Sequence, residues 1–272
     1  MTKKFIAGGC SFTFGHELSD DNDGKIPSKK TWAYRLMERL RGMKPAEFNN
    51  DYICTAKAGA GNQTIARKVF NAVANTKDIS CVAVMWSFLP RYDWAMPQHK
   101  LLEDTRWTSI TPWDTNKGQA GVMQKLANSE PHKREWKVRR ENMKETGVGD
   151  FADALYKYAS NDYHEIYLSW KSIIWLQNIL EKRKIPFVFT LADNSLFYDK
   201  EVCHCEKDSF MKALYNEIDF TKWASFGERM MGFNQWALIN DYERGVTHPL
   251  DKAHQDAVQL IKNKARKILG VK

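Results

Sequence analysis

The sequence has no apolar run long enough to cross a bilayer, and it is not rich in cysteine, proline or glycine. A membrane-spanning helix takes about 18–20 consecutive apolar residues, so we expect no membrane association. The 272 residues include 5 cysteines, 8 prolines and 15 glycines, which excludes a disulfide-rich scaffold and a low-complexity chain. The cysteine count is odd, and the apolar segment before Gly8 is too short for a secretion signal. We therefore expect reduced thiols and a cytoplasmic protein.

The composition that is present is that of a globular protein with an excess of basic residues. Hydrophobic residues make up 43% and charged residues 27% of the chain, and its length fits a single domain, 1–272, that carries an insertion. The formal net charge of +8 permits attraction to nucleic acid. No nucleic-acid-binding motif accompanies that charge, so a solvated basic surface is favoured, and a nucleic-acid-associated basic protein stays open as an alternative.

Short apolar segments alternate along the chain with segments of helical periodicity. The short segments have the continuous apolar character of strands buried on both faces, and they cover residues 4–7, 52–55, 81–86 and 186–191. The helical stripes cover residues 31–40, 62–74, 166–180 and 250–269. Such alternation predicts an α/β fold in which a mostly parallel sheet lies between two layers of helices.

The third and fourth predicted strands are separated by a long segment, residues 90–160. It is too long for a simple crossover, so we expect an insertion that packs over the sheet as a lid. It is rich in tryptophan, with Trp94, Trp107, Trp113 and Trp136, and it is basic between Lys125 and Lys144. Aromatic residues in such a segment more often form a core than a ligand platform.

Polar residues follow the ends of the predicted strands. In an open α/β sheet, ligands bind outside the carboxyl ends of the strands, and the residues that converge there are Ser11, Gly59, Ser87, Asp193, Asn194 and, before the last helix, His248. Ser11 lies at a strand-to-helix turn, where nearby backbone N–H groups can stabilise an oxyanion. A serine hydroxyl needs a base, and the neutral imidazole of His248 suits that role. Taken singly, Ser11 is as easily a helix cap, and His248 is more often a surface loop residue.

Three short motifs resemble the conserved blocks of the SGNH/GDSL hydrolases. Gly9-Cys10-Ser11-Phe12-Thr13 resembles the first block, Ala56-Lys57-Ala58-Gly59-Ala60-Gly61-Asn62 the second, and Thr247-His248-Pro249 the last. The Gly-Cys-Ser-Phe-Thr form, with Trp86-Ser87 and Arg91, is similar to SGNH-like proteins of tailed bacteriophages, which would place this chain in a host cytoplasm. The motifs occur in the family's order over nearly the whole chain.

This resemblance implies a flavodoxin-like sandwich with Ser11 as nucleophile and His248 as base. Backbone N–H groups of Ser11 and Gly59 would form part of the oxyanion hole. The implied reaction is ester hydrolysis or acyl transfer through an acyl-serine, on a small acyl or acetyl ester such as that of a carbohydrate or a modified polymer. No metal or organic cofactor is implied.

The chain departs from the family at two positions. Gly245 stands where the family has an aspartate three residues before the histidine, so we expect Asp241 to orient the imidazole, with Glu243 and Asp193 as alternatives. The family's asparagine after the third strand is also missing, and Ser87 or Asn62 is expected to donate in its place. Loss of one oxyanion donor costs about 10²–10³ in rate. A non-catalytic binding module of the same fold is therefore the main alternative.

Two weaker signals remain. Cys203-His204-Cys205 has spacing too tight for a common zinc site, and no second pair follows, so no metal site is predicted. His16 and Glu17 follow the Ser11 turn and are candidates only for lining a pocket.

Overall fold

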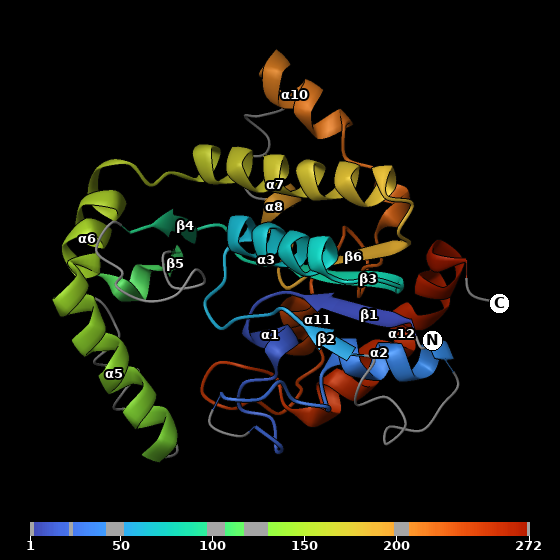
Figure 1. Ribbon diagram of the computed structural model, residues 1–272, viewed down its shortest axis with the longest axis horizontal. Helices are drawn as coiled ribbons and strands as arrows, with labels where there is room; N and C mark the ends of the chain where they lie inside the picture. The colour runs from blue at the N-terminus through green and yellow to red at the C-terminus, as the bar shows by residue number, and fades with distance from the viewer. Residues whose placement is uncertain are drawn as a thin grey trace.

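A four-stranded parallel sheet forms the centre of the computed structural model (Figure 1). The structure describes residues 3–21, 24–41, 52–96, 107–116, 130–198 and 207–270. The sheet has the order β2-β1-β3-β6 and consists of β1 (Lys4–Gly8), β2 (Tyr52–Cys54), β3 (Ile79–Trp86) and β6 (Phe187–Leu191). A parallel bridge joins Phe189 to Trp223 on the outer side of β6. The order is that of a flavodoxin-like sheet.

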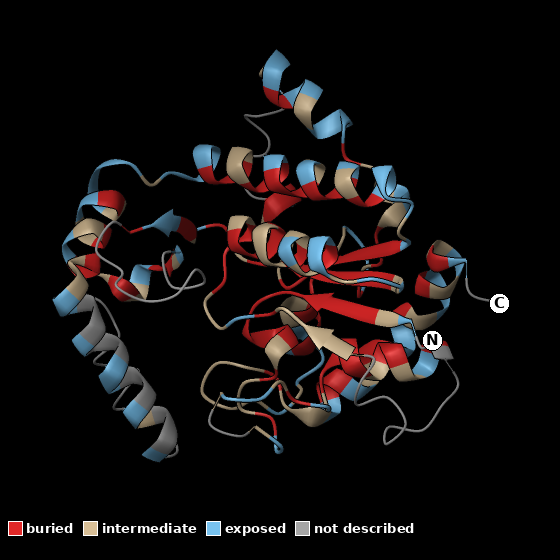
Figure 2. Cartoon of the chain, viewed as in Figure 1, coloured by how far each residue is buried: buried red, intermediate tan, exposed pale blue. Residues whose placement is uncertain are grey.

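Helices cover both faces of the sheet. Two pairs pack together, one on each face (Figure 1): α3 (Asn62–Asn75) with α7 (Asp162–Lys182), and α2 (Trp32–Arg41) with α12 (Asp251–Leu269). Because both faces are covered, every residue of β6 is buried, and Figure 2 shows the buried residues gathered in the sheet and on the inward sides of the helices. The predicted three-layer sandwich with a mostly parallel sheet is confirmed, and its eight core elements lie within a few residues of their predicted bounds.

The segment after β3 contains a hairpin and two helices within its described residues. The hairpin pairs β4 (Tyr92–Ala95) antiparallel with β5 (Trp107–Ile110), and it is followed by η3 (Pro112–Asp114), α5 (Glu130–Thr146) and α6 (Val148–Tyr158). Figure 1 shows α5 and α6 to one side of the sheet, beyond the hairpin.

Buried polar contacts tie this hairpin to the helices of the sandwich. Arg67 Nε of α3 lies 2.7 Å from Asp93 Oδ2 of β4, and Thr64 Oγ1 donates to Asp93 Oδ1 at 2.9 Å. On the other side, the Tyr92 hydroxyl donates to Glu165 Oε1 of α7 at 2.6 Å. Asp93 and Glu165 are both buried, so loss of either contact would remove one of the few hydrogen bonds that satisfy a buried carboxyl group. The base of the insertion is therefore fixed to the sheet domain.

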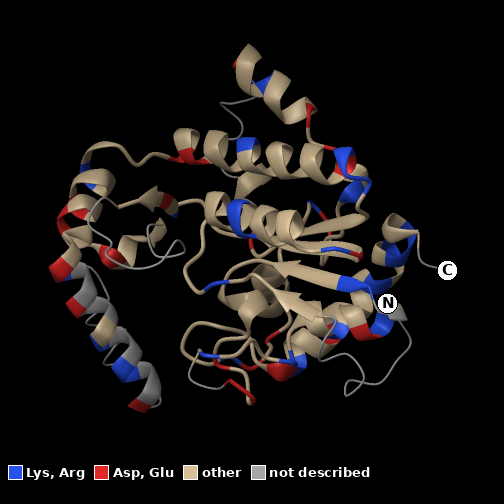
Figure 3. Ribbon diagram, viewed as in Figure 1, with Lys and Arg blue, Asp and Glu red and all other residues tan. Residues whose placement is uncertain are grey.

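Between β6 and α12, residues 192–198 and 207–250 contain four short helical segments. They are α8 (Ser195–Tyr198), α10 (Ser209–Asn216), η4 (Phe220–Lys222) and α11 (Phe233–Ile239). Among the residues that the structure describes, no helix is both long enough and apolar enough to cross a membrane. Figure 3 shows Lys and Arg positions interspersed with Asp and Glu along the helices.

Candidate active site

Ser11 lies at the carboxyl end of β1, where the chain turns directly into a short helix. The helix α1 (Ser11–Phe14) begins at Ser11, after Cys10 as its N-cap. Gly9 has a φ of +158°, and a Cβ there would lie 2.1 Å from Thr13 Oγ1, so the turn requires glycine. The first N–H groups of a helix have no acceptor within it. The turn thus presents the Ser11 hydroxyl beside backbone donors, at the sheet edge where the sequence places it.

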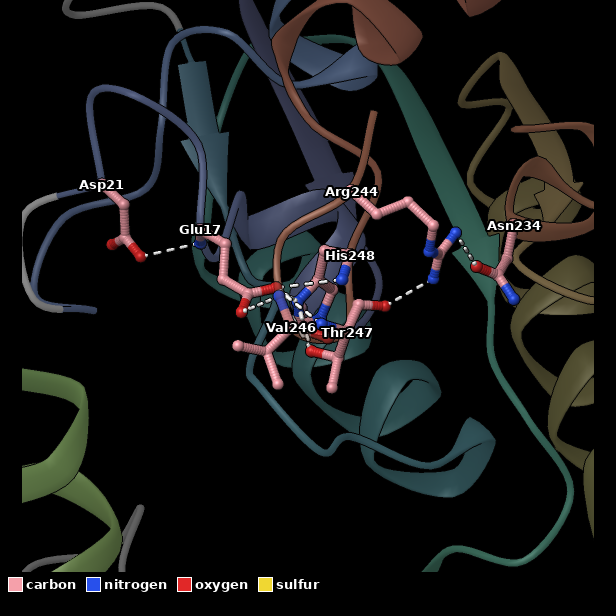
Figure 4. Close-up of polar contacts among 8 residues, drawn as sticks. Glu17, Asp21, Asn234, Arg244, Val246, Thr247 and His248 are labelled. Carbon is pink, nitrogen blue, oxygen red and sulfur yellow. Dashed lines mark hydrogen bonds and ion pairs between the residues drawn. The ribbon is translucent and has the colours of Figure 1, made fainter. Parts of the chain in front are cut away.

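Ser11, His248 and Glu17 form a continuous chain of hydrogen bonds. His248 Nε2 lies 2.7 Å from Ser11 Oγ, and His248 Nδ1 lies 2.8 Å from Glu17 Oε2. Thr247 Oγ1 is a second neighbour of Nδ1, at 2.7 Å. Figure 4 shows the Glu17 carboxylate pointing at residues 246–248. A hydroxyl, an imidazole and a carboxylate in this order can take up and return a proton.

The Glu17 carboxylate also binds the backbone that carries His248. It accepts hydrogen bonds from the N–H groups of Val246, Thr247 and His248, at 2.9, 3.0 and 2.9 Å. Glu17 itself has a φ of +66°, and its own N–H donates to Asp21 Oδ2 at 2.9 Å. The same carboxylate therefore fixes both the ring and the loop of His248.

Arg244 holds this loop from its other side. Its Nη2 donates to the Thr247 carbonyl at 2.7 Å, and its Nη1 donates to Asn234 Oδ1 at 3.1 Å (Figure 4). Burial lowers the pKa of Arg244, against the opposing effect of the Glu17 charge. The loop is thus fixed by a carboxylate on one side and a guanidinium on the other.

The protonation states suit an imidazole base. Burial alone would raise the pKa of Glu17, but the hydrogen bond and charge of His248, with the backbone N–H groups of Thr247 and His248, lower it to about 2. Burial lowers the pKa of His248, against the opposing effect of Glu17. At neutral pH the carboxylate is therefore charged and the imidazole is neutral, which leaves Nε2 able to accept the Ser11 proton.

Asp241 does not orient His248, and this part of the sequence-based assignment is wrong. Asp241 has a φ of +52° and follows the end of α11, where its N–H donates to the Leu238 carbonyl. The alternative Asp193 accepts from the Ser195 N–H at 2.9 Å. Glu243 pairs through its backbone carbonyl with the Leu250 N–H. The imidazole nitrogen that these residues were expected to contact is bound by Glu17.

The absence of a side chain at Gly245 explains how the Glu17 carboxylate can reach His248 Nδ1. A Cβ at position 245 would lie 2.9 Å from both Cδ and Oε2 of Glu17, closer than ordinary van der Waals contact. The space that a side chain at 245 would occupy is filled by the Glu17 carboxylate. The sequence carried a signal for this exchange, since it lacks the acid before the histidine and has a carboxylate six residues after Ser11.

Of the four expected oxyanion donors, Ser11 and Gly59 remain suitable. Gly59 has a φ of +73° in the loop before α3, and among the described residues neither its N–H nor that of Ser11 has a backbone acceptor. Asn62 and Ser87 instead bond to each other. The Asn62 amide accepts from the Ser87 N–H at 2.7 Å and donates to the Ser87 carbonyl at 3.1 Å and to Ser169 Oγ at 3.0 Å.

This pairing corrects the expected role of Asn62 and of the Ser87 N–H. Both residues are buried, and a buried amide is satisfied by such partners rather than left open for a ligand. Their contacts join the start of α3 to the end of β3. The pair therefore shapes the loop that carries Gly59, and it supplies no donor from Asn62 or from the backbone of Ser87.

Aromatic rings surround the Ser11–His248 contact. The Phe12 ring lies 5.0 Å from the His248 ring between centroids, and Phe88 and Phe233 pack on Phe12 at 6.0 and 5.9 Å. The His16 ring lies 6.1 Å from that of His248, so this residue does border the site. Ser11 is 7% exposed and the His248 side chain 12% exposed, and limited access of water strengthens electrostatic interactions within the site.

No metal centre is found among the residues that the structure describes. No three or more His, Cys, Asp or Glu residues gather there as a set of metal ligands. Cys203, His204 and Cys205 lie outside the described residues, as do residues 117–129, which include Lys125.

Comparison with known proteins found one similar solved structure. It is the crystal structure of a putative GDSL-like lipase from Parabacteroides merdae ATCC 43184, with 12% sequence identity and a TM-score of 0.40, over 100% of this chain and 99% of that chain. No family model and no curated protein matches the chain.

Proposed function

We propose that this chain is a serine hydrolase of the SGNH type that cleaves a small acyl ester, with Ser11 as nucleophile, His248 as base and Glu17 as the acid that orients the base. One observation carries the proposal: the two hydrogen bonds, of 2.7 and 2.8 Å, that join Ser11 Oγ to His248 and His248 to Glu17. A serine that only caps a helix needs no imidazole on its hydroxyl, and a loop histidine needs no buried carboxylate.

The reaction begins with attack of Ser11 Oγ on the ester carbonyl carbon. His248 Nε2 takes the hydroxyl proton as the Oγ–C bond forms, and the carbonyl electron pair moves to the oxygen. The N–H groups of Ser11 and Gly59 stabilise that oxyanion. The imidazolium formed at this step is stabilised by Glu17, which stays ionised because its pKa is about 2.

Collapse of the tetrahedral intermediate breaks the bond to the alcohol. The departing oxygen takes the proton from Nε2, which leaves an acyl-serine. Water then gives a proton to Nε2 and attacks the acyl carbon, and Ser11 Oγ leaves and recovers that proton. An alcohol in place of water would give acyl transfer by the same steps.

The surroundings of Ser11 favour a small acyl group. Ser11 is only 7% exposed, and the neighbouring residue Phe12 packs against the rings of Phe88 and Phe233. We propose further that the ester is an acetyl ester of a carbohydrate or a modified polymer. The insertion, residues 90–160, would act as a lid over that substrate. A panel of p-nitrophenyl esters of rising acyl length, followed by acetylated sugars, tests the substrate class.

A fluorophosphonate probe tests the activity itself. We expect the wild-type protein to be labelled at Ser11 and Ser11→Ala to remain unlabelled. Ser225→Ala is the matched control, because its hydroxyl donates to the Gly227 carbonyl, and it should be labelled like the wild type.

Absence of labelling and of ester turnover in the wild type would contradict the proposed enzymatic activity and favour a non-catalytic binding module. Binding to DNA at low salt by the same protein would favour the nucleic-acid alternative.

A further inference from the structure

The candidate oxyanion hole has two backbone donors and no side-chain donor from Asn62. Both N–H groups of the Asn62 amide are bonded, to the Ser87 carbonyl and to Ser169 Oγ, and Asn62 is 3% exposed. Releasing the amide would leave those buried partners unsatisfied. A third donor, if the reaction uses one, therefore comes from a residue other than Asn62.

Arg91 lies beside both of these residues. Its Nη1 donates to Ser87 Oγ at 3.0 Å and to the Ala60 carbonyl at 3.3 Å, and Ala60 directly follows Gly59. A Cβ at Gly61 would lie 2.5 Å from the Arg91 carbonyl oxygen. The backbone of Arg91 thus packs directly on the loop that contains Gly59, and glycine at 61 is what permits this approach.

Aromatic packing connects the Arg91 guanidinium to the Ser11–His248 pair. The guanidinium carbon lies 4.9 Å from the centroid of the Phe88 ring. Phe88 packs on Phe12, which follows Ser11 in the chain and contacts the His248 ring. Burial is the main reason that the pKa of His248 is lowered, and the charge of Arg91 acts in the same direction.

We propose that Arg91 is the third oxyanion-stabilising residue of this site, and that its guanidinium takes the place of the side-chain amide that the site lacks. This inference rests on the proposed function. A guanidinium is always charged and presents N–H donors on a planar fork. In a site that excludes water, a fixed cation beside the developing oxyanion stabilises the transition state more than the neutral ester. The contacts to Ser87 and Ala60 keep the group in position before the reaction begins.

Kinetics of Arg91→Gln test the inference. We expect kcat for a neutral p-nitrophenyl ester to fall about 10²-fold, with KM changed less than about threefold, because the charge acts on the oxyanion and not on the uncharged substrate. The rate of fluorophosphonate labelling should fall in parallel, because its phosphoryl oxygen becomes negative in the same place. Arg91→Lys should lose less than Arg91→Gln, since it keeps the charge.

Three controls make the result decisive. Arg183→Gln removes a guanidinium whose Nη1 donates to the Val73 carbonyl on α3, and it should leave kcat unchanged. Ser87→Ala removes the hydroxyl that binds Arg91 while it keeps the guanidinium, and it supplies the test if Arg91→Gln does not fold. We expect Ser87→Ala to lower kcat by about 10-fold. Added guanidinium ion should partly restore the kcat of Arg91→Ala, and it should leave the kcat of Ser87→Ala unchanged.

Failure of this inference is distinct from failure of the proposed function. If the wild type is labelled at Ser11 and folded Arg91→Gln keeps kcat within threefold, Arg91 has no oxyanion role and the hydrolase assignment stands. If KM rises while kcat is unchanged, Arg91 binds the substrate only and the inference is overturned. If the wild type is not labelled, both proposals are wrong.

Discussion

The two sides of Ser11 are built in different ways. On the proton-transfer side, one carboxylate binds the imidazole and three successive backbone N–H groups. On the oxyanion side, Asn62 is used to join α3 to β3, and Arg91 packs over the loop. On the first side, the carboxylate comes from the segment after α1 and not from the residues before His248. On the second side, the Asn62 amide makes structural hydrogen bonds, and the Arg91 guanidinium lies against the loop that contains Gly59.

This difference shows that the carboxylate which contacts an imidazole can come from a segment far from the histidine in sequence. Glu17 approaches His248 from the segment after α1, and Gly245 leaves the space that it needs. A search limited to acids at a fixed distance before His248 would therefore miss Glu17. The geometry at Nδ1, rather than the position in the sequence, identifies the acid.

A change at Gly245 that disturbs the Glu17–His248 contact is expected to lower activity more than a change at Asn62. In Gly245→Asp, the new Cβ would lie 2.9 Å from the Glu17 carboxylate, and two carboxylates in one small site repel each other. We expect kcat to fall about 10²-fold, with partial recovery when Glu17→Gly is added, as measured by ester turnover. Gly227→Ala is the control, since its new Cβ would meet only the flexible Met231 side chain. Full activity of Gly245→Asp would show that Glu17 is not needed in its observed place.

A smaller effect is expected on the oxyanion side from Asn62→Ala. This change removes three buried hydrogen bonds and leaves the Ser87 N–H without its partner. The free energy of unfolding should fall by about 1–3 kcal/mol, as measured by urea denaturation, and activity should fall by about 10-fold as the Gly59 loop loosens. If stability were unchanged and activity fell by 10³, Asn62 would be a direct oxyanion donor.

The same two sides differ in how much of their structure could be predicted from the sequence. Hydrophobic periodicity located the strands and helices of the sandwich, and the topology of a parallel sheet was enough to bring Ser11 and His248 together. Glu17 was not identified because its role depends on a left-handed turn and on empty space at Gly245, and both are properties of the folded chain. The Asn62–Ser87 pairing was missed for a similar reason, since an amide after a strand looks the same in sequence whether it faces a ligand or the backbone.

The insertion was predicted only in outline. Its length indicated a separate substructure, but the hairpin of β4 and β5 depends on contacts with α3 and α7. The Asp93–Arg67 and Tyr92–Glu165 contacts join residues 26 and 73 positions apart, and no local pattern encodes such pairs. The hydrophobic alternation of two four-residue strands is also too short to be distinctive.

The smallest expected effect is a shift in the pH at which activity is lost on the acid side. The shift should have opposite signs in Arg91→Gln and Glu17→Gln. His248 must be neutral to accept the Ser11 proton, so activity should be lost as pH falls through its pKa, which burial lowers below the usual value of 6.5. The acid limb of kcat/KM should therefore have its midpoint below pH 6.5. Arg91→Gln removes a charge that lowers this pKa and should move the limb to higher pH, whereas Glu17→Gln removes a group that raises it and should move the limb lower. Shifts in the same direction would contradict the placement of these two charges.

Intact-protein mass spectrometry of fluorophosphonate labelling, compared between Glu17→Gln and Asp241→Asn, tests the central claim most directly. The Ser11–His248–Glu17 chain predicts that Glu17→Gln slows labelling of Ser11 by about 10²–10⁴, while Asp241→Asn is labelled at the wild-type rate. Slow labelling of Asp241→Asn with wild-type labelling of Glu17→Gln would contradict the claim and return the role of the acid to the residue before the histidine.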